Sequence, residues 1–382
     1  MKFAAIIAEF NPLSNGHKYI IDKLKEMLPD HKILVIMSGD FVQRGEPSII
    51  SKFTRAKHAT ICGADVVIEL PFAYATTSAE DFAYGAIKTL NSIPNVTSLV
   101  FGSECGDINL LHNELEKIEK SNKTTAIKSS LKGGNSYASS LINLIGGDIL
   151  TKPNNMLGIM YLKALKETNS SIKPITIKRI DNYNSPAESP LASSSAIREA
   201  IKNKSPNLAT MVPSCSLNDL LDLVPPNLDS LHSLISYKIL TTSAADLGEI
   251  YGISEGIEYK LLEENKLGKT FDNLVENCTS KRYPSSKIKR ILCHILLNLT
   301  KQDMQAIKSC KPYIKILAIN ENSKKEILKT LSTANSTLIT KKKDFALLDK
   351  EQALCIHFDT LSTNIHSILT KSNKDKDFLV KI

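Results

Sequence analysis

The fold is decided by the opening stretch Phe3-Ala4-Ala5-Ile6-Ile7-Ala8-Glu9-Phe10-Asn11-Pro12-Leu13-Ser14-Asn15-Gly16-His17-Lys18-Tyr19. Residues 3–8 form an uninterrupted apolar run, short enough to be a strand buried on both faces, as in a parallel sheet. Asn11-Pro12 ends the strand, because the residue before a proline is pushed out of the helical region. Over residues 16–28 apolar side chains recur on one face, which predicts a helix.

A strand, a tight polar turn and a helix N-terminus aim unpaired backbone N–H groups at one point, which suits an anion. His17, in the first turn of the predicted helix, adds a ring N–H that can reach a phosphate oxygen. Asn-Gly-His taken alone is also compatible with a plain strand-to-helix connection carrying a turn glycine and a surface histidine. The remaining loops of the chain therefore decide between these interpretations.

Length and composition describe a globular chain rather than a membrane or secreted one. The 382 residues favour two or three domains, and the 42% hydrophobic and 23% charged content is ordinary for such proteins. No apolar run approaches the roughly 18 residues of a membrane span, and the apolar run near the N-terminus is too short for a secretory signal. We expect a cytoplasmic protein with no membrane partner. The seven cysteines show no zinc spacing, so no metal site is expected.

Short strand-like and helical patterns alternate over residues 1–205, which predicts a doubly wound α/β domain with a parallel sheet. The strands are expected at 3–8, 32–37, 65–70, 97–102 and 174–179, and the helices at 16–28, 52–62, 79–91 and 155–167. Residues 105–150 are interpreted as a helical insertion in this domain. Residues 210–382 are predicted to form a second, mainly helical domain, with a small α/β patch at 312–341.

Several polar segments follow the predicted strands and should meet at the carboxyl edge of the sheet. They are Met37–Pro47, Phe101–Glu104, Arg179 and, at helix starts, Lys152–Gly158 and Ser193–Arg198. Each has a plainer interpretation as a surface loop, a turn glycine or a helix cap. Together, their serines, glycines and cations could cradle a polyphosphate.

The densest basic stretch is Lys281-Arg282-Tyr283-Pro284-Ser285-Ser286-Lys287-Ile288-Lys289-Arg290, with five cations in ten residues and no acid. A mildly basic protein of net charge +8 is compatible with nucleic-acid binding without requiring it. Lys287 and Arg290 would share a helix face, and Tyr283 could stack on a base. A solvated helix end would look similar. Gly268-Lys269-Thr270 is not a P-loop, because Glu263 stands where that motif needs glycine.

These blocks, in this order, resemble the tRNA(Met) cytidine acetate ligase family of the HxGH nucleotidyltransferase superfamily. The matching segments are Ile6–Tyr19, Met37–Pro47, Leu70-Pro71, Phe101–Glu104, Pro153–Tyr161, Thr176–Arg179 and Ala192–Arg198, with Glu255-Gly256 and the 281–290 stretch beyond them. The resemblance implies an enzyme that forms acetyl-adenylate from acetate and ATP. It further implies acetyl transfer to the exocyclic N4 amine of the wobble cytidine of elongator tRNA(Met), with no DNA partner.

The resemblance also implies which residues form the site. His17 matches the second histidine of HxGH, and the catalytic set is expected to be His17, Ser14, Asp40 and Arg198. ATP is expected to contact Ile7, Ala8, Glu9, Phe10, Asn11, Pro12, Leu13, Ser14, Asn15, Gly16, His17, Lys18, Tyr19, Ile20, Gly102, Asn155, Arg179, Ser193, Ser194 and Ser195. The tRNA is expected at Lys281, Arg282, Tyr283, Lys287, Lys289 and Arg290, and Mg²⁺ is expected with the phosphates.

The sequence departs from the family pattern at two positions. Ser14 replaces the first histidine of HxGH, so it can donate a hydrogen bond but cannot carry charge, and Asp40 replaces the usual asparagine after Ser-Gly. Whether Asp40 assists proton transfer is open at this point. The chemistry needs no protein nucleophile, because acetate attacks the α-phosphate and the protein positions groups and stabilises charge.

Two other functions are compatible with the sequence. The same pocket could serve a small-molecule nucleotidyltransferase acting on a cofactor precursor, although the long basic helical half argues against a compact enzyme of that kind. A non-enzymatic, ATP-sensing RNA-binding protein is the third interpretation, in which Ser14 marks lost catalysis.

Overall fold

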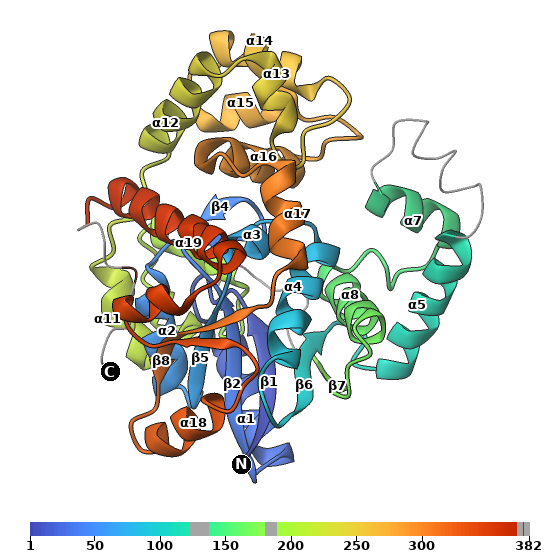
Figure 1. Ribbon diagram of the computed structural model, residues 1–382, viewed down its shortest axis with the longest axis vertical. Coiled ribbons are helices and arrows are strands. Elements are labelled where there is room, and N and C mark those ends of the chain that lie inside the picture. The colour runs from blue at the N-terminus through green and yellow to red at the C-terminus, as the bar shows by residue number, and fades with distance from the viewer. Residues whose placement is uncertain (123–136, 180–188, 373–376, 378–382) are drawn as a thin grey trace.

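The computed structural model describes residues 1–122, 137–179, 189–372 and 377. One sheet organises the molecule (Figure 1), with strand order β7-β6-β1-β2-β5-β8-β9. All neighbouring strands pair in parallel except β5 and β8. The strands are β1 Lys2–Ala8, β2 His31–Ser38, β5 Val66–Leu70, β6 Val96–Ser103, β7 Lys173–Lys178, β8 Tyr313–Ile319 and β9 Thr337–Ile339, with a separate hairpin of β3 Phe41–Val42 and β4 Glu46–Pro47. The predicted doubly wound α/β fold is confirmed.

Alternation along the buried strands explains why helices cover both faces of the sheet. In β1, Ala4 and Ile6 pack into one apolar cluster while Ala5 and Ile7 pack into the other. Because successive side chains of a strand point to opposite faces, an unbroken apolar run needs a helical layer on each side. The layers include α1 Asn15–Met27 and α2 Lys52–Ile61 on one face, and α4 Ala79–Asn91 and α8 Pro153–Glu167 on the other.

The strands near the C-terminus are placed differently from the expectation. We expected 312–341 to be a small patch of the second domain, but β8 pairs antiparallel with β5 and β9 pairs with β8, so both strands extend the first sheet. The pairing joins residues about 250 positions apart, and no local pattern in the sequence encodes such a contact. The helix between these strands is α18 Lys324–Leu331.

The helices of the C-terminal half lie largely above the sheet (Figure 1) and share its larger apolar cluster. They are α12 Leu228–Thr241, α13 Ala244–Glu249, α14 Ile257–Leu267, α15 Phe271–Cys278, α16 Ser285–Leu297, α17 Lys301–Ser309, the 3₁₀ helix η1 Lys342–Leu347 and α19 Lys350–Leu369. The remaining helices are α3 Phe72–Ala75, α5 Ile108–Asn122, α7 Tyr137–Ile145, α9 Ser194–Lys202, α10 Leu208–Met211 and α11 Ser214–Leu221. None of the described helices is long and apolar enough to cross a membrane.

A buried ionic cluster holds the C-terminal part against the sheet. Lys52 of α2 and Lys315 of β8 each pair with Glu69 of β5 and with Asp377. Burial alone would raise the pKa of Asp377, but the two ammonium groups outweigh it and hold that pKa well below its usual range. Each charge is therefore compensated, which is the condition for keeping such groups in a protein interior.

The division into two domains stays a prediction.

Candidate active site

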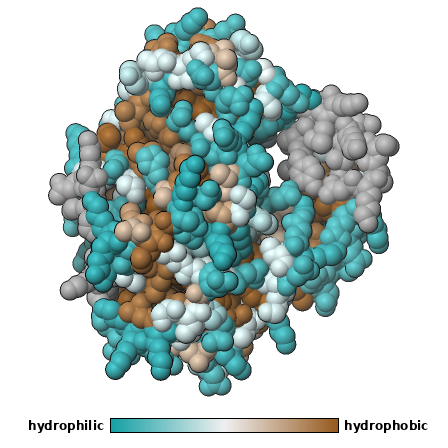
Figure 2. All heavy atoms as spheres, viewed as in Figure 1, coloured by the Kyte–Doolittle hydropathy of each residue, from teal (hydrophilic) through white to brown (hydrophobic). Residues whose placement is uncertain are grey.

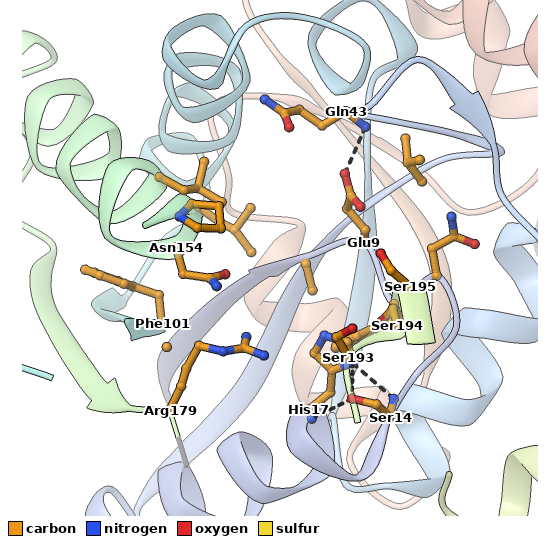
Figure 3. A pocket seen from close by; sticks show the side chains of 18 of the residues that line it. Glu9, Ser14, His17, Gln43, Phe101, Asn154, Arg179, Ser193, Ser194 and Ser195 are labelled. Carbon is orange, nitrogen blue, oxygen red and sulfur yellow. Dashed lines mark hydrogen bonds between the residues drawn. The ribbon is translucent and has the colours of Figure 1, made fainter. Parts of the chain in front are cut away.

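A cavity of about 600 Å³ opens at the carboxyl edge of the sheet. Its walls come from the loops after β1, β6 and β7, from the β3–β4 hairpin and from the N-termini of α8 and α9 (Figure 3). This position follows from the topology, because the carboxyl ends of parallel strands converge where the strand order reverses. Many of the predicted residues meet here: Ile7, Ala8, Glu9, Phe10, Asn11, Ser14, His17, Ile20, Gly102, Arg179, Ser193, Ser194, Ser195 and Arg198 all line the cavity.

Arg55, a buried residue of α2, holds the loop after β1 against the segments that flank the β3–β4 hairpin. Its Nη1 donates to the carbonyls of Glu9 (2.5 Å) and Ser38 (3.1 Å), and its Nε donates to Ile50 (3.1 Å). The guanidinium also reaches the Gly39 carbonyl. Backbone carbonyls at strand ends have no ladder partner, so one five-donor side chain satisfies several of them at once. The spacing between the β1 and β2 loops is thereby fixed.

His17 is held as a neutral donor by Ser14. The Ser14 backbone N–H donates to Nδ1 of His17 (3.1 Å), while the Ser14 hydroxyl accepts from the His17 backbone N–H (3.3 Å), a reciprocal cap of α1. An Nδ1 that accepts leaves the proton on Nε2. Burial, together with the positive charge of Arg179, lowers the pKa of His17 to about 3. At neutral pH the ring therefore offers a hydrogen bond rather than a charge.

The same geometry explains what Ser14 does in place of a histidine. Its hydroxyl and its backbone N–H both engage His17. Ser14 also borders the cavity, and Phe10 packs edge-on against the His17 ring at 5.0 Å between centroids. We infer that Ser14 sets the tautomer and orientation of His17.

The start of α9 is docked onto the β1–α1 loop. Arg198 donates to the Asn11 carbonyl (2.7 Å) and the Ser195 hydroxyl (3.2 Å), and the Ser194 hydroxyl donates to the Pro12 carbonyl (2.9 Å). Asn15 adds a bond from its side-chain amide to the Thr210 carbonyl (2.8 Å). Burial lowers the pKa of Arg198 from its high ordinary value. The N-terminus of α9 and its arginine thus face the cavity alongside His17.

The opposite wall is built around Glu104, Asn154 and Asn155. One carboxylate oxygen of Glu104 accepts from the Asn154 side-chain amide (2.8 Å), and the other accepts from the Asn155 backbone N–H (2.8 Å), so Glu104 caps α8. Asn155, expected to contact ATP, is buried with its side chain bonded to the Cys105 N–H (3.1 Å) and the Ile149 carbonyl (3.2 Å). It is Asn154, the preceding residue, that lines the cavity.

Gly102 and Arg179 face each other across the β6–β7 pair. A Cβ on Gly102 would lie 3.0 Å from Ile20 and 3.2 Å from the Arg179 side chain, so a larger residue would crowd the guanidinium. Arg179 extends from the end of β7 toward the centre of the cavity (Figure 3). The expectation that these two positions share a pocket with His17 therefore holds in the structure.

Some predicted residues lie outside the cavity lining. Asp40 is buried, its carboxylate accepts from the Lys52 backbone N–H (2.8 Å), and Lys52, Arg55 and the nearby His366 outweigh burial to lower its pKa. Lys18 pairs with Asp22 on the surface of α1. The other predicted ATP contacts without a place in the lining are Pro12, Leu13, Asn15, Gly16, Tyr19 and Asn155.

The structure adds lining residues that sequence reasoning missed, chiefly Gln43 and Arg44 of the hairpin, Phe101, Glu104, Asn154 and Tyr161. Gln43, Arg44, Phe101 and Glu104 fall in segments that follow a strand, and Asn154 falls in the helix-start segment Lys152–Gly158. Tyr161 lies beyond that segment, within α8. A signal was available for Arg44, a cation in the polar loop Met37–Pro47. To predict that Asn154 and not Asn155 faces the cavity, one must know which residues of α8 point to which side. That depends on where the helix begins, and α8 begins at Pro153 rather than at the expected residue 155.

The basic stretch 281–290 is engaged largely with the protein itself. Lys289 pairs with Glu46 (2.6 Å), Arg290 donates to the Gln43 carbonyl (3.4 Å), and Arg282 pairs with Glu255. The Tyr283 ring is buried, its hydroxyl bonds Ser254, and Lys287 covers the ring at 3.8 Å. A buried ring cannot stack on a base, so the expectation for Tyr283 is corrected. Lys281 is exposed.

These contacts join the basic stretch to the cavity. Gly45, at the tip of the hairpin, has φ +74°, and a Cβ there would stand 2.3 Å from the backbone of Arg290 in α16. Cys293 of α16 also bonds the Gly45 carbonyl (3.3 Å). Because Gln43 and Arg44 line the cavity on the other side of the hairpin, one short element separates α16 from the site.

No group of three His, Cys, Asp or Glu side chains in the described part of the chain could hold a metal ion. A magnesium ion at this site would therefore be carried mainly by the phosphates of a nucleotide, as is usual for that ion.

Together, the fold and the cavity define an α/β protein with an arginine-lined cavity at its sheet edge. A family model described as HIGH Nucleotidyl Transferase matches residues 1–379. The relatives include the tRNA(Met) cytidine acetate ligases of Clostridium perfringens (36% identical; 100% of this chain, 98% of that protein) and Clostridium novyi (38%; 99% and 98%). A crystal structure of Thermotoga maritima TmcAL bound with alpha-thio ATP is 26% identical, with TM-score 0.89 and both chains fully covered. The chain belongs to the tRNA(Met) cytidine acetate ligase family of HIGH nucleotidyl transferases, and it is a ligase.

Proposed function

We propose that this chain condenses acetate with ATP to acetyl-adenylate and transfers the acetyl group to the N4 amine of the wobble cytidine of elongator tRNA(Met). The observation that carries the proposal is the convergence of His17, Arg179, Arg198 and the α9 N-terminus on one cavity. The names of the relatives and the ATP analogue bound by the Thermotoga protein support the same substrates. Acting on tRNA, the enzyme would work in the cytoplasm.

In the first step a carboxylate oxygen of acetate attacks the α-phosphorus, the bond to the β-phosphate oxygen breaks and pyrophosphate leaves. No protein nucleophile is needed, so catalysis consists of alignment and of stabilising negative charge on the phosphoryl oxygens. His17 Nε2–H supplies a neutral hydrogen bond, and Arg179 and Arg198 supply positive charge. Magnesium, when bound with the phosphates, would neutralise further charge.

In the second step the cytidine amine attacks the acetyl carbonyl and AMP leaves. The base must be unstacked to enter the cavity, which costs little in an anticodon loop whose bases are already accessible. We propose that Lys281, Arg282, Lys287, Lys289 and Arg290 contribute to holding the tRNA beside the hairpin. Electrostatic attraction to the RNA backbone would dominate that contact.

The test is acetate-dependent exchange of labelled pyrophosphate into ATP, followed by mass analysis of tRNA(Met) after incubation with protein, ATP and labelled acetate. Exchange that requires acetate and a tRNA mass increase of one acetyl group at the wobble cytidine are the expected results. Exchange with a different carboxylic acid but not with acetate would instead favour the small-molecule nucleotidyltransferase.

A further inference from the structure

Glu9 is a carboxylate placed inside the cavity beside the cationic groups of the site. It follows β1 directly, and its side chain lies between the hairpin and the start of α9 (Figure 3). Its Oε1 accepts from the Gln43 backbone N–H (2.9 Å), and no hydrogen bond within the described residues reaches Oε2. A fixed carboxylate with one unengaged oxygen in a ligand cavity is a group able to accept a proton.

The backbone around Glu9 is held from several sides. Arg55 binds its carbonyl at 2.5 Å, and Phe10, the next residue, has φ +48°, an uncommon conformation for a bulky residue. The hairpin that supplies the Gln43 N–H is packed against α16 through Gly45 and Arg290. Strained backbone that is over-determined by its neighbours is a frequent property of active sites.

The electrostatic surroundings raise the proton affinity of Glu9. Burial raises the pKa of Glu9, and this rise is only partly offset by the Gln43 N–H and by the cations Arg44, Arg198 and Arg55. The phenol of Tyr161, another lining residue, has its own pKa raised by burial and by the charge of Glu9. A base is most effective when its pKa approaches the working pH.

Two other carboxylates near the site are poorly suited to the role. Both oxygens of Glu104 accept hydrogen bonds at the start of α8, from Asn154 and Asn155. Asp40 lies outside the cavity lining and accepts from the Lys52 N–H. Glu9 is thus the carboxylate of the described lining with an oxygen left for a substrate.

We propose that Glu9 is the general base of the acetyl-transfer step, an inference that rests on the proposed function. The amine nitrogen of the cytidine forms a bond to the acetyl carbonyl carbon, and the carbon–oxygen bond to the phosphate breaks, releasing AMP. The proton lost by the amine passes to Oε2 of Glu9, which returns it to solvent after the product leaves. Adenylate formation involves no such proton and does not use Glu9 as a base.

The experiment compares Glu9→Gln with wild type in the two half-reactions. The amide is isosteric and keeps an oxygen for the Gln43 N–H, so any loss of acetate-dependent pyrophosphate exchange should be at least about tenfold smaller than the loss of transfer. Single-turnover transfer from preformed acetyl-adenylate to tRNA(Met) should fall by about 10²–10⁴-fold, the usual contribution of a general base. Wild-type transfer should decline as the pH falls through the pKa of Glu9, and the variant should lose that decline.

The matched control is Glu199→Gln, because Glu199 is an exposed carboxylate of α9 that bonds Asn203 and is absent from the lining. It should leave both half-reactions unchanged. Transfer at the wild-type rate in Glu9→Gln, an unchanged pH profile, or equal loss of exchange and transfer in a variant with wild-type thermal stability would each overturn the proposal. Failure of exchange and transfer in the wild-type protein would instead reject the proposed function itself.

Discussion

The cavity and the basic stretch 281–290 are both rich in cations, yet the cations of the two regions face different surroundings. In the cavity, Arg179 and Arg198 come from a strand end and a helix start and face the site. In the basic stretch, Lys289, Arg290 and Arg282 are engaged by the hairpin or by Glu255. The strand order of a parallel sheet predicts that residues at strand ends lie at one edge, whereas a run of charged residues in a sequence does not predict which way their side chains point. The comparison can be tested by substitutions that separate the two regions.

Among the substitutions that separate these two regions, the largest effect is expected at His17. Replacing it with alanine removes the Nε2–H donor from the cavity and should slow acetate-dependent pyrophosphate exchange by about 10²–10³-fold, the typical cost of one lost transition-state donor. Lys23→Ala, on the exposed face of the same helix and paired with Glu26, is the control and should have wild-type exchange. A comparable loss in both variants would mean that the effect arises from α1 folding rather than from the site.

The pH dependence of the same assay tests how His17 acts. Because its pKa is about 3 in the folded protein against an ordinary 6.5, the ring is neutral throughout pH 5–8. We therefore expect no loss of exchange on raising the pH through 6.5. The free energy of unfolding should depend on pH in the opposite direction to that of a protein with an ion-paired histidine. A lowered folded pKa contributes stability above pH 6.5 that is lost as the pH falls from 6.5 toward 3. An exchange rate that falls with an inflection near 6.5 would indicate a charged His17.

Much of the fold could be predicted because the spacing of apolar residues along the chain indicates strands and helices locally. The strands expected at 3–8, 32–37 and 97–102 are β1, β2 and β6 with bounds shifted by one residue at most. The position of the cavity could be predicted for the same reason, since the segments that follow parallel strands reach the same edge of the sheet. What could not be predicted depends on side-chain direction and distant pairing. Asp40 turns into the ionic interior, Asn154 replaces Asn155, and β8 adds antiparallel to β5.

Tyr283 belongs to the basic stretch, but we expect its substitutions to change the stability of the fold and not the affinity for tRNA. Since the ring is buried, Tyr283→Ala should destabilise the protein by about 3 kcal/mol, and Tyr283→Phe, which loses only the bond to Ser254, by about 1 kcal/mol. Urea unfolding measures both, and tRNA affinity of folded Tyr283→Phe should equal that of wild type. Weaker tRNA binding by the phenylalanine variant at unchanged stability would restore a direct role for the tyrosine.

A smaller effect is expected from the cations of the basic stretch, and it should differ between two of them. Lys281→Ala should lower tRNA affinity and reduce the slope of affinity against salt by about 1, with exchange unchanged. Arg290→Ala should weaken tRNA binding and also reduce acetyl transfer, because Arg290 supports the Gln43 segment that holds Glu9. Lys324→Ala, a surface lysine of α18 paired with Glu321, is the control. Identical profiles for Lys281 and Arg290 would argue against coupling through the hairpin.

The smallest effect is expected at Lys18. This residue tests whether ATP contacts follow from position in the expected run Ile7–Ile20 or from the lining of the cavity. Lys18 follows His17 directly and belongs to the expected ATP-binding run, but on a helix it points about 100° away, and its ammonium pairs with Asp22 at 2.5 Å on the surface. Lys18→Ala should therefore change the KM for ATP in the exchange assay by less than about twofold, since exposed helix pairs contribute little. A tenfold rise in that KM, with His17 intact, would mean that the phosphates extend out of the cavity over α1. The convergence of loops at the sheet edge would then describe only part of the nucleotide site.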